Sequence, residues 1–179
     1  MFQILRATLQ DAQLLSRLSI DTFLPAHGHS APKADIDNYV AQNFNKENFI
    51  KELSDDNNRF YILYANDQVA GYSKIVFNQD NENITAKNTA YMSRLYLLEE
   101  FYGSGLGKKL FDFNLALCKE NKQSGIWLAV WIENQKAISF YKKMKFKKVG
   151  EFDFKISDTH SNPNHILHLD FKEVNTFGA

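Results

Sequence analysis

The chain has 179 residues, of which 44% are hydrophobic and 23% charged, and we expect one domain, residues 1–179, with an apolar core. Acidic and basic side chains number 13 and 9 in residues 1–100 (−4) and 8 and 12 in residues 101–179 (+4), so the net charge is zero, which argues against nucleic acid as the main partner. With one cysteine, no signal-peptide core and no apolar run near the roughly 18 residues of a membrane span, the chain is expected to be cytoplasmic, without disulfides or a membrane partner.

Hydrophobic spacing predicts the elements of the first half. A strand is expected at 2–7, followed by a helix that Thr8 caps and whose apolar residues recur at helical spacing as far as Phe23. Residues 25–32 contain two prolines and a glycine and predict a loop. Short helices are expected at 35–44 and 46–53, strands at 59–64 and 69–77 around the hairpin signal Asn66-Asp67, and a polar loop at 78–88.

The second half alternates strands with helices. Strands are expected at 89–98, 126–130, 146–156 and 166–171, and helices at 106–121 and 135–144, with a polar loop before the last strand. Antiparallel hairpins and crossover connections in one chain predict an α/β fold, with a mixed central sheet of about six or seven strands flanked by helices. Apolar edge strands near the C-terminus would allow a homodimer.

The run Gly-Ser-Gly-Leu-Gly at 103–107 lies between a predicted strand and a predicted helix and holds three of the eight glycines. Backbone N–H groups at a helix start lack intrahelical partners, and the helix dipole is positive there, so this run suits a phosphate group. A P-loop is excluded because its first glycine would be Tyr102 and its hydroxyl position is Lys109. A dinucleotide fingerprint is disfavoured because the third glycine, Gly107, comes one residue early.

Two segments resemble motifs of the GNAT superfamily of acyl-CoA-dependent N-acetyltransferases. Residues 95–110 (LYLLEEFYGSGLGKKL) resemble its cofactor motif, a strand leading into (Gln/Arg)-x-x-Gly-x-(Gly/Ala) at a helix start, with Tyr102 in place of the first polar residue. Residues 127–146 (WLAVWIENQKAISFYKKMKF) resemble a later motif, an Asn followed seven residues on by a Tyr, here Asn134 and Tyr141. By residue chemistry alone, Asn134 predicts a helix N-cap and Tyr141 a core side chain.

The resemblance implies an N-acetyltransferase that binds acetyl-CoA as co-substrate, needs no metal and acetylates the primary amine of a small molecule. Stretches such as VAGY at 69–72, and the segment around Tyr141, are similar to the bacterial spermine/spermidine N-acetyltransferase branch, which implies a polyamine acceptor. Two alternatives stay open. The acceptor could be a protein N-terminus, a lysine or another small amine, or the chain could be a non-catalytic module that binds acetyl-CoA and regulates a partner.

The resemblance also implies roles for particular residues. Tyr141 would protonate the departing CoA thiolate, and Asn134 would contact the pantetheine arm. Strand backbone at 95–97 would bond the pantetheine and polarise the acetyl carbonyl, with Leu97 the best single choice, and the glycine run would wrap the pyrophosphate. The implied cofactor-binding residues besides Asn134 are Leu95, Tyr96, Leu97, Gly103, Ser104, Gly105, Leu106, Gly107 and Lys108.

The sequence leaves the general base unassigned. Relatives often carry a Glu on the strand before the glycines or on the strand before the Asn, and here these positions are Ser93 and Ala129. Glu133, Glu99 and His27 are candidates by proximity in sequence alone, and a water chain toward bulk solvent is an equally good alternative.

Three other features have ordinary structural interpretations. Lys145 stands where relatives have a glycine that ends the Tyr-bearing helix in a left-handed conformation, so strain or a different turn is expected there. The histidine pairs at 27–29 and 165–168 lack the Cys or carboxylate cluster of a metal site. Trp127 and Trp131 alternate with their neighbours along a predicted strand and are expected in the core.

Overall fold

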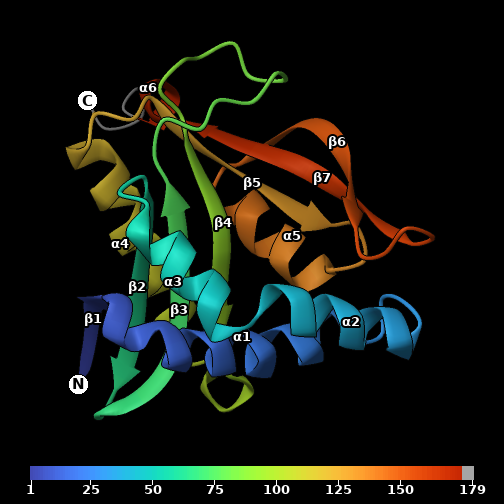
Figure 1. Cartoon of the computed structure of the whole chain (residues 1–179). Helices are drawn as coiled ribbons and strands as arrows, with labels where there is room; N and C mark the ends of the chain where they lie inside the picture. The colour runs from blue at the N-terminus through green and yellow to red at the C-terminus, as the bar shows by residue number, and fades with distance from the viewer. Residues whose placement is uncertain (175–179) are drawn as a thin grey trace.

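The computed structural model describes residues 1–174 and confirms the predicted α/β class, with helices flanking a seven-stranded mixed sheet in the order β1-β2-β3-β4-β5-β7-β6 (Figure 1). The strands are β1 (Phe2–Arg6), β2 (Asn58–Ala65), β3 (Gln68–Val76), β4 (Ala90–Leu97), β5 (Gly125–Trp131), β6 (Lys147–Lys155) and β7 (Ser161–Asp170). The helices are α1 (Ala12–His27), α2 (Lys33–Asn43), α3 (Lys46–Ser54), α4 (Leu106–Glu120), α5 (Gln135–Lys143) and α6 (Phe171–Val174), with short 3₁₀ turns η1 (Leu9–Asp11) and η2 (Glu99–Phe101).

Strands β1 to β4 form an antiparallel meander in chain order. The predicted β2–β3 hairpin is confirmed: Asn66 and Asp67 have φ of 48° and 65°, the left-handed values that a type I′ turn requires at both central positions. Thr8 caps η1 rather than α1, and both its hydroxyl and its backbone N–H donate to Asp11. Local sequence signals therefore set this half of the sheet correctly.

Helices cover both faces of the sheet. Side chains alternate in direction along each strand, so apolar residues on both faces need a helix to pack against. In β2, Phe60 and Ile62 pack in a core with α1, α2 and α3. The next residue along, Leu63, packs instead with Leu106 and Leu110 of α4. The N-terminal helices and α4 therefore lie on opposite sides of the strands. Within residues 1–174, no helix has the length and apolar character to cross a bilayer.

Besides the cap at Thr8, three further expectations are wrong. The loop expected at 25–32 starts later, because α1 runs to His27 and Pro25 lies in its last turn, where the missing N–H removes a single helical bond. The last strand begins at Ser161, since polar residues of the expected loop pair with β6, with Pro163 opposite Asp153. The apolar strand β7 lies inside the sheet, so the C-terminal edge is the charged strand β6, which is poorly suited to pairing with a second copy.

Strands β4 and β5 pair in parallel over a very short length. The registered pairs are Ala90 with Ile126 and Tyr91 with Trp127. Just beyond them β4 has a bulge at Ser93, the extra residue between the positions that pair with Lys74 and Ile75 of β3. The two strands diverge toward their carboxyl ends, where the chain continues into α4 and α5 (Figure 1).

A cluster of ion pairs connects α3 to the sheet beside the bulge. Glu52 of α3 pairs with Lys74 of β3 at 2.7 Å and with Arg94 of β4 at 3.1 Å, and all three side chains are largely buried. Burial by itself would raise the pKa of Glu52, but Arg94 and Lys74 together hold it below its ordinary value. The Arg94 guanidinium also lies over the rings of Phe44, Phe49 and Phe60.

We expect Glu52→Gln to lower the free energy of unfolding at neutral pH by about 3 kcal/mol, because it leaves two buried cations without their counter-charge. At pH values above 4.5, the ordinary pKa of Glu52, its carboxylate stabilises the fold. This contribution is lost as the pH falls through the lower folded-state pKa, so the stability difference between variant and wild type should shrink in acid. Urea unfolding at neutral and acidic pH measures both effects. Asp37→Asn, which breaks the exposed pair with Lys33, is the control and should change stability little. A deficit that is equal at both pH values would contradict the assignment.

The strain expected at Lys145 is confirmed, since its φ is 70° immediately after the C-cap of α5. We expect Lys145→Gly to raise the free energy of unfolding by about 1 kcal/mol, because it removes the β-carbon clash of the left-handed conformation. Lys142→Gly, one turn earlier within the helix, should instead destabilise by up to about 1 kcal/mol. Denaturant unfolding of both variants tests this, and a Lys145→Gly protein less stable than the wild type would refute it.

Candidate active site

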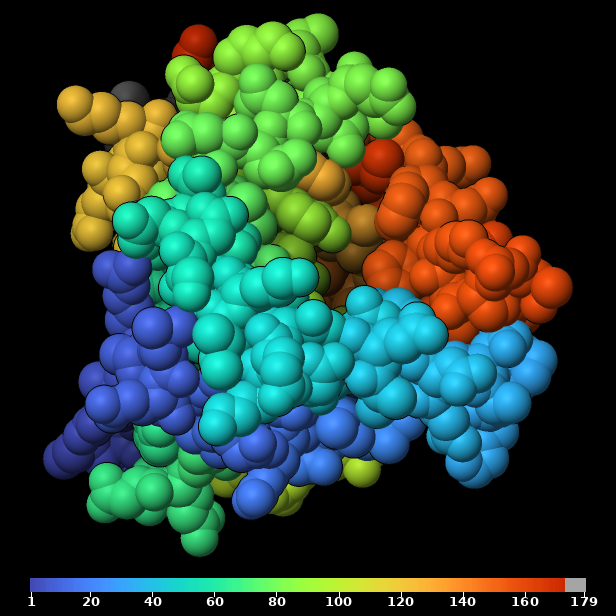
Figure 2. Space-filling view, in the orientation of Figure 1, coloured from blue at the N-terminus to red at the C-terminus, as the bar shows by residue number. Residues whose placement is uncertain are grey.

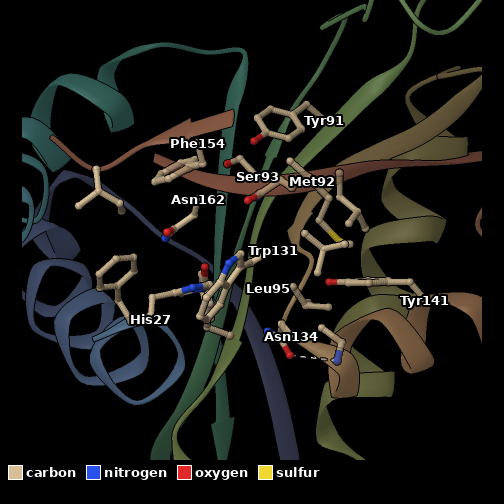
Figure 3. Close-up of a pocket in the computed structure, with 18 residues that line it drawn as sticks. His27, Tyr91, Met92, Ser93, Leu95, Trp131, Asn134, Tyr141, Phe154 and Asn162 are labelled. Carbon is tan, nitrogen blue, oxygen red and sulfur yellow. Dashed lines mark hydrogen bonds between the residues drawn. The ribbon is translucent and has the colours of Figure 1, made fainter. Parts of the chain in front are cut away.

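A pocket of about 130 Å³ opens where β4 and β5 diverge. In Figure 2 the surface is hollowed near the centre of the view, between the N-terminal helices and the orange β6–β7 segment. Side chains of α1, β4, β5, α5 with its N-cap, and the β6–β7 hairpin meet around it (Figure 3). The eighteen lining residues are Phe23, His27, Tyr91, Met92, Ser93, Leu95, Tyr96, Leu128, Ala129, Val130, Trp131, Asn134, Ala137, Tyr141, Phe154, Ile156, Asn162 and Asn164.

The edge of β4 that faces the gap presents backbone donors. The N–H of Leu98 donates to the Ala70 carbonyl of β3 at 2.9 Å. Because N–H groups alternate in direction along a strand, those of Leu97 and Leu95 point to the opposite edge, toward β5. The registered pairs with β5 end before this point. This stretch of β4 can therefore hydrogen-bond a ligand that inserts between the strands.

The glycine run connects β4 to the first turn of α4. Gly103 and Gly105 have φ of 76° and 79°, and Gly105 is the N-cap of the helix. A β-carbon at either position would meet no atom within 4 Å, so the backbone here is uncovered, and glycine is needed for its conformation rather than for space. The N–H groups of the first helical turn have no intrahelical carbonyl to bond. The Leu106 N–H donates to Ser104 Oγ at 3.4 Å, and the other N–H groups of this turn form a second set of donors at the carboxyl end of β4.

Asn134 and Tyr141 both combine a structural role with a position on the pocket. Asn134 caps α5, its Oδ1 accepting from the Ala137 N–H at 3.2 Å, as the dashed line in Figure 3 shows. The Tyr141 ring is buried against Phe111, Phe140 and Phe146, while its hydroxyl points into the pocket (Figure 3). Burial raises the pKa of Tyr141 above its ordinary value, so the phenol stays protonated at neutral pH.

The structure brings together part of the predicted set. Leu95, Tyr96, Asn134 and Tyr141 line the pocket. The side chain of Leu97 packs against the start of α4, with its Cδ1 3.4 Å from where a β-carbon on Gly107 would lie. The remaining predicted residues, at 103–108, lie beyond the pocket lining at the start of α4, where Lys108 pairs with Asp112 at 2.6 Å.

The two positions where relatives often carry a Glu, Ser93 and Ala129, do line the pocket. Neither side chain can accept a proton usefully. Ser93 Oγ is buried and has no hydrogen-bond partner among residues 1–174. Glu99 and Glu133 are exposed and outside the lining.

Sequence reasoning missed most of the pocket end formed by α1, Trp131 and the β6–β7 hairpin. It named only His27, as a candidate base, and the structure places this residue in the lining. Trp131 is largely buried, as expected, but it also lines the pocket and contacts two histidine rings, His27 at 5.8 Å and His29 at 5.4 Å. Strand alternation places Trp131 on the same face as Ala129, and this was the available signal. Burial, with a smaller effect from His29, lowers the pKa of His27 to about 4.

A second groove, of about 410 Å³, adjoins the pocket. Ile156 lines both, and the Tyr39 ring of the groove contacts Phe154 of the pocket at 5.7 Å. The groove contains two carboxylates, Asp35 and Asp158, and the cation Lys155, which pairs with Asp158 at 2.6 Å. Within residues 1–174, no group of three or more His, Cys, Asp or Glu side chains could hold a metal ion.

Comparison with known proteins gives consistent matches. Residues 17–146 match the model of the acetyltransferase (GNAT) family. An uncharacterized N-acetyltransferase of Lactobacillus delbrueckii subsp. lactis is 29% identical over 87% of this chain and 90% of its own. The spermine/spermidine N(1)-acetyltransferase of Bacillus subtilis is 30% identical over 44% of this chain and 49% of its own. The crystal structure of the PaiA N-acetyltransferase of Thermoplasma acidophilum with coenzyme A superposes with a TM-score of 0.75 at 19% identity, covering 96% of this chain and 99% of that one.

The Asn134 cap can be tested by its contribution to stability. Asn134→Ala is expected to lower the free energy of unfolding by about 1 kcal/mol, because the Ala137 N–H loses its acceptor. Asn134→Asp keeps an acceptor oxygen and should stay near the wild type. Thermal and urea unfolding measure both, and an aspartate variant as unstable as the alanine variant would contradict the capping role.

Proposed function

The chain belongs to the acetyltransferase (GNAT) family and is an N-acetyltransferase, and on this premise we propose that residues 1–179 act as one domain that transfers the acetyl group of acetyl-CoA to a primary amine of a polyamine such as spermidine or spermine. One observation carries the proposal: the gap between β4 and β5 has backbone donors along one edge, helix-start N–H groups beyond its end and a buried tyrosine hydroxyl facing it.

The residues present fit acetyl-CoA. The N–H groups of Leu95 and Leu97, which point into the gap, bond the pantetheine arm and the acetyl carbonyl, and Asn134 contacts the arm beside α5. The glycine segment binds the pyrophosphate through its uncovered backbone and the helix dipole. The unpartnered Ser93 Oγ supports a polar ligand in the pocket.

These residues can promote direct attack of the amine on the thioester. Held beside the acetyl group, the free amine forms a C–N bond as the C–S bond breaks. The Leu97 N–H stabilises the negative charge that develops on the carbonyl oxygen. Tyr141, protonated because burial raises its pKa, donates its proton to the departing thiolate.

The polyamine acceptor is supported by chemistry around the pocket. Aromatic rings of Tyr96, Trp131 and Phe154 line it, and such rings attract ammonium groups. In the adjoining groove Asp158 already pairs with Lys155, so a long amine with one end in the pocket can place a second ammonium group near Asp35. The local similarity to the spermine/spermidine enzyme points the same way.

Tyr141→Phe tests the proposed proton donor. We expect the rate of thiol release from acetyl-CoA with spermidine to fall by a factor of about 100 or more, since a general acid is lost, while the calorimetric affinity for acetyl-CoA is retained. Tyr64→Phe, which removes a hydroxyl outside the pocket, is the matched control and should keep the wild-type rate. An unchanged rate in Tyr141→Phe would overturn the role of the tyrosine.

The acceptor is tested with the wild-type protein on a panel of amines. Spermidine and spermine are expected to give thiol release and acetylated products identified by mass spectrometry. Asp35→Asn should raise KM for spermidine more than for a monoamine of similar length. Release with peptide N-termini or lysines, but not with polyamines, would move the acceptor to those groups. Absence of release with every amine, despite acetyl-CoA binding, would refute the proposed function.

A further inference from the structure

The amine must lose a proton during acetyl transfer, and the pocket offers very few groups that can take it. Its eighteen lining residues include no Asp, Glu, Lys, Arg or Cys. Burial raises the pKa values of its three tyrosines, Tyr91, Tyr96 and Tyr141, so they are protonated at neutral pH. His27 is the one lining side chain that can accept a proton there.

The surroundings of His27 hold its ring without occupying its nitrogens. The ring lies in the last turn of α1 and contacts Phe23 at 5.0 Å, Trp131 at 5.8 Å and Tyr96 at 6.4 Å. Within residues 1–174, neither ring nitrogen has a hydrogen-bond partner, and both nitrogens keep some solvent-accessible surface. The imidazole is therefore positioned by packing, with nitrogen lone-pair and N–H positions open to the pocket.

His27 and Tyr141 lie at opposite ends of the pocket in Figure 3. Leu95 of β4 lies between them in the same view. A thioester held against β4 would then have Tyr141 on its sulfur side. The opposite side, lined by α1 and the β6–β7 hairpin, is left for the amine. This arrangement places Tyr141, the proton donor to sulfur, and His27, a possible acceptor of the amine proton, on opposite sides of the thioester.

We propose that His27 is the general base of the transfer, taking the proton of the attacking amine on an unprotonated ring nitrogen, directly or through one water molecule. This rests on the proposed function. The acceptor first loses its ammonium proton to solvent and reacts as the free amine. As the C–N bond forms and the C–S bond breaks, the nitrogen gives one further proton to His27 and the sulfur receives one from Tyr141. His27 then releases its proton to solvent and Tyr141 regains one, so the cycle balances without oxidation or reduction.

The charge state of His27 suits this role. The titratable groups beside it are His29 of the same segment and Tyr96 of β4. Burial and His29 keep the ring neutral at neutral pH, so its lone pair is available and it does not repel a cationic substrate. A weakly basic imidazole is sufficient because an amine nitrogen becomes far more acidic once it has bonded to the carbonyl carbon.

The test compares His27→Gln with the wild type and with His165→Gln, which replaces a histidine outside the pocket lining. At neutral pH we expect kcat for spermidine to fall by a factor of about 100 or more in His27→Gln, with an unchanged calorimetric affinity for acetyl-CoA. The deficit should narrow toward about pH 10, where hydroxide can take the proton. His165→Gln should keep the wild-type kcat.

Two further readouts separate base catalysis from packing. In His27→Ala, added imidazole should restore part of kcat, since a free base can occupy the vacated space. In the wild type, the ring resonances of His27 observed by NMR should shift on addition of spermidine, and those of His165 should not.

The outcomes are distinct. Suppose that the wild type turns over, but His27→Gln keeps the wild-type kcat and pH profile, or differs only by a raised KM. Then His27 is not the base, although the proposed function stands. A folded His27→Ala protein that imidazole does not rescue would also overturn the proposal. If the wild type releases no thiol with any amine, the proposed function fails, and this inference fails with it.

Discussion

The parallel pairing of β4 with β5 ends after two residue pairs, and the rest of the site depends on this. Backbone N–H groups in a sheet interior are normally paired, because an unpaired buried donor costs free energy. Beyond Tyr91 the edge of β4 loses its neighbour, so a ligand that inserts there gains hydrogen bonds the sheet has left unmade. Because the two strands are parallel, their carboxyl ends lie side by side, and the helices that follow them, α4 and α5, begin at that same end.

The closed end of the gap is held by packing and by ion pairs. The rings of Tyr91 and Trp127, the last registered pair, stack at 4.0 Å with an interplanar angle of 14°, and Trp127 Nε1 donates to the Gln79 carbonyl. On the other side of the bulge, Arg94 is held by Glu52 and by aromatic rings. The bulge at Ser93 thus lies between two well-packed positions, so the divergence of the strands is a fixed feature of the fold.

Burial acts on the two proposed proton-transfer groups in the same way, although their pKa values move in opposite directions. A low-dielectric environment disfavours charge, so it raises the pKa of the Tyr141 phenol and lowers that of the His27 imidazole. Both groups are therefore neutral at neutral pH, one as a donor and the other as an acceptor. An aromatic pocket without carboxylates can in this way support acid–base chemistry, while the acidic side chains Asp35 and Asp158 lie in the adjoining groove.

Most of the fold was predictable because its signals are local. The spacing of hydrophobic residues predicted the positions of the strands and helices, and the turn residues Asn66-Asp67 predicted the β2–β3 hairpin. One error arose where distant partners decide, since β7 extends because β5 and β6 pair with its polar start. The error at Pro25 was local, since a proline in the last helical turn removes only one bond. The spacing of Asn134 and Tyr141 was readable for the same reason, since one helix carries both residues to the pocket.

The sequence by itself determined the glycine-flanked start of α4, the capped helix that carries Tyr141 and the family to which these motifs belong, because each depends on residues within a few turns of one another. Only the tertiary structure decided which groups share the pocket. It brings His27 from the end of α1 to a pocket shared with Tyr141, more than a hundred residues later, while the nearer candidates Glu99 and Glu133 stay outside. Proximity in the chain does not determine proximity in space once seven strands must share one sheet.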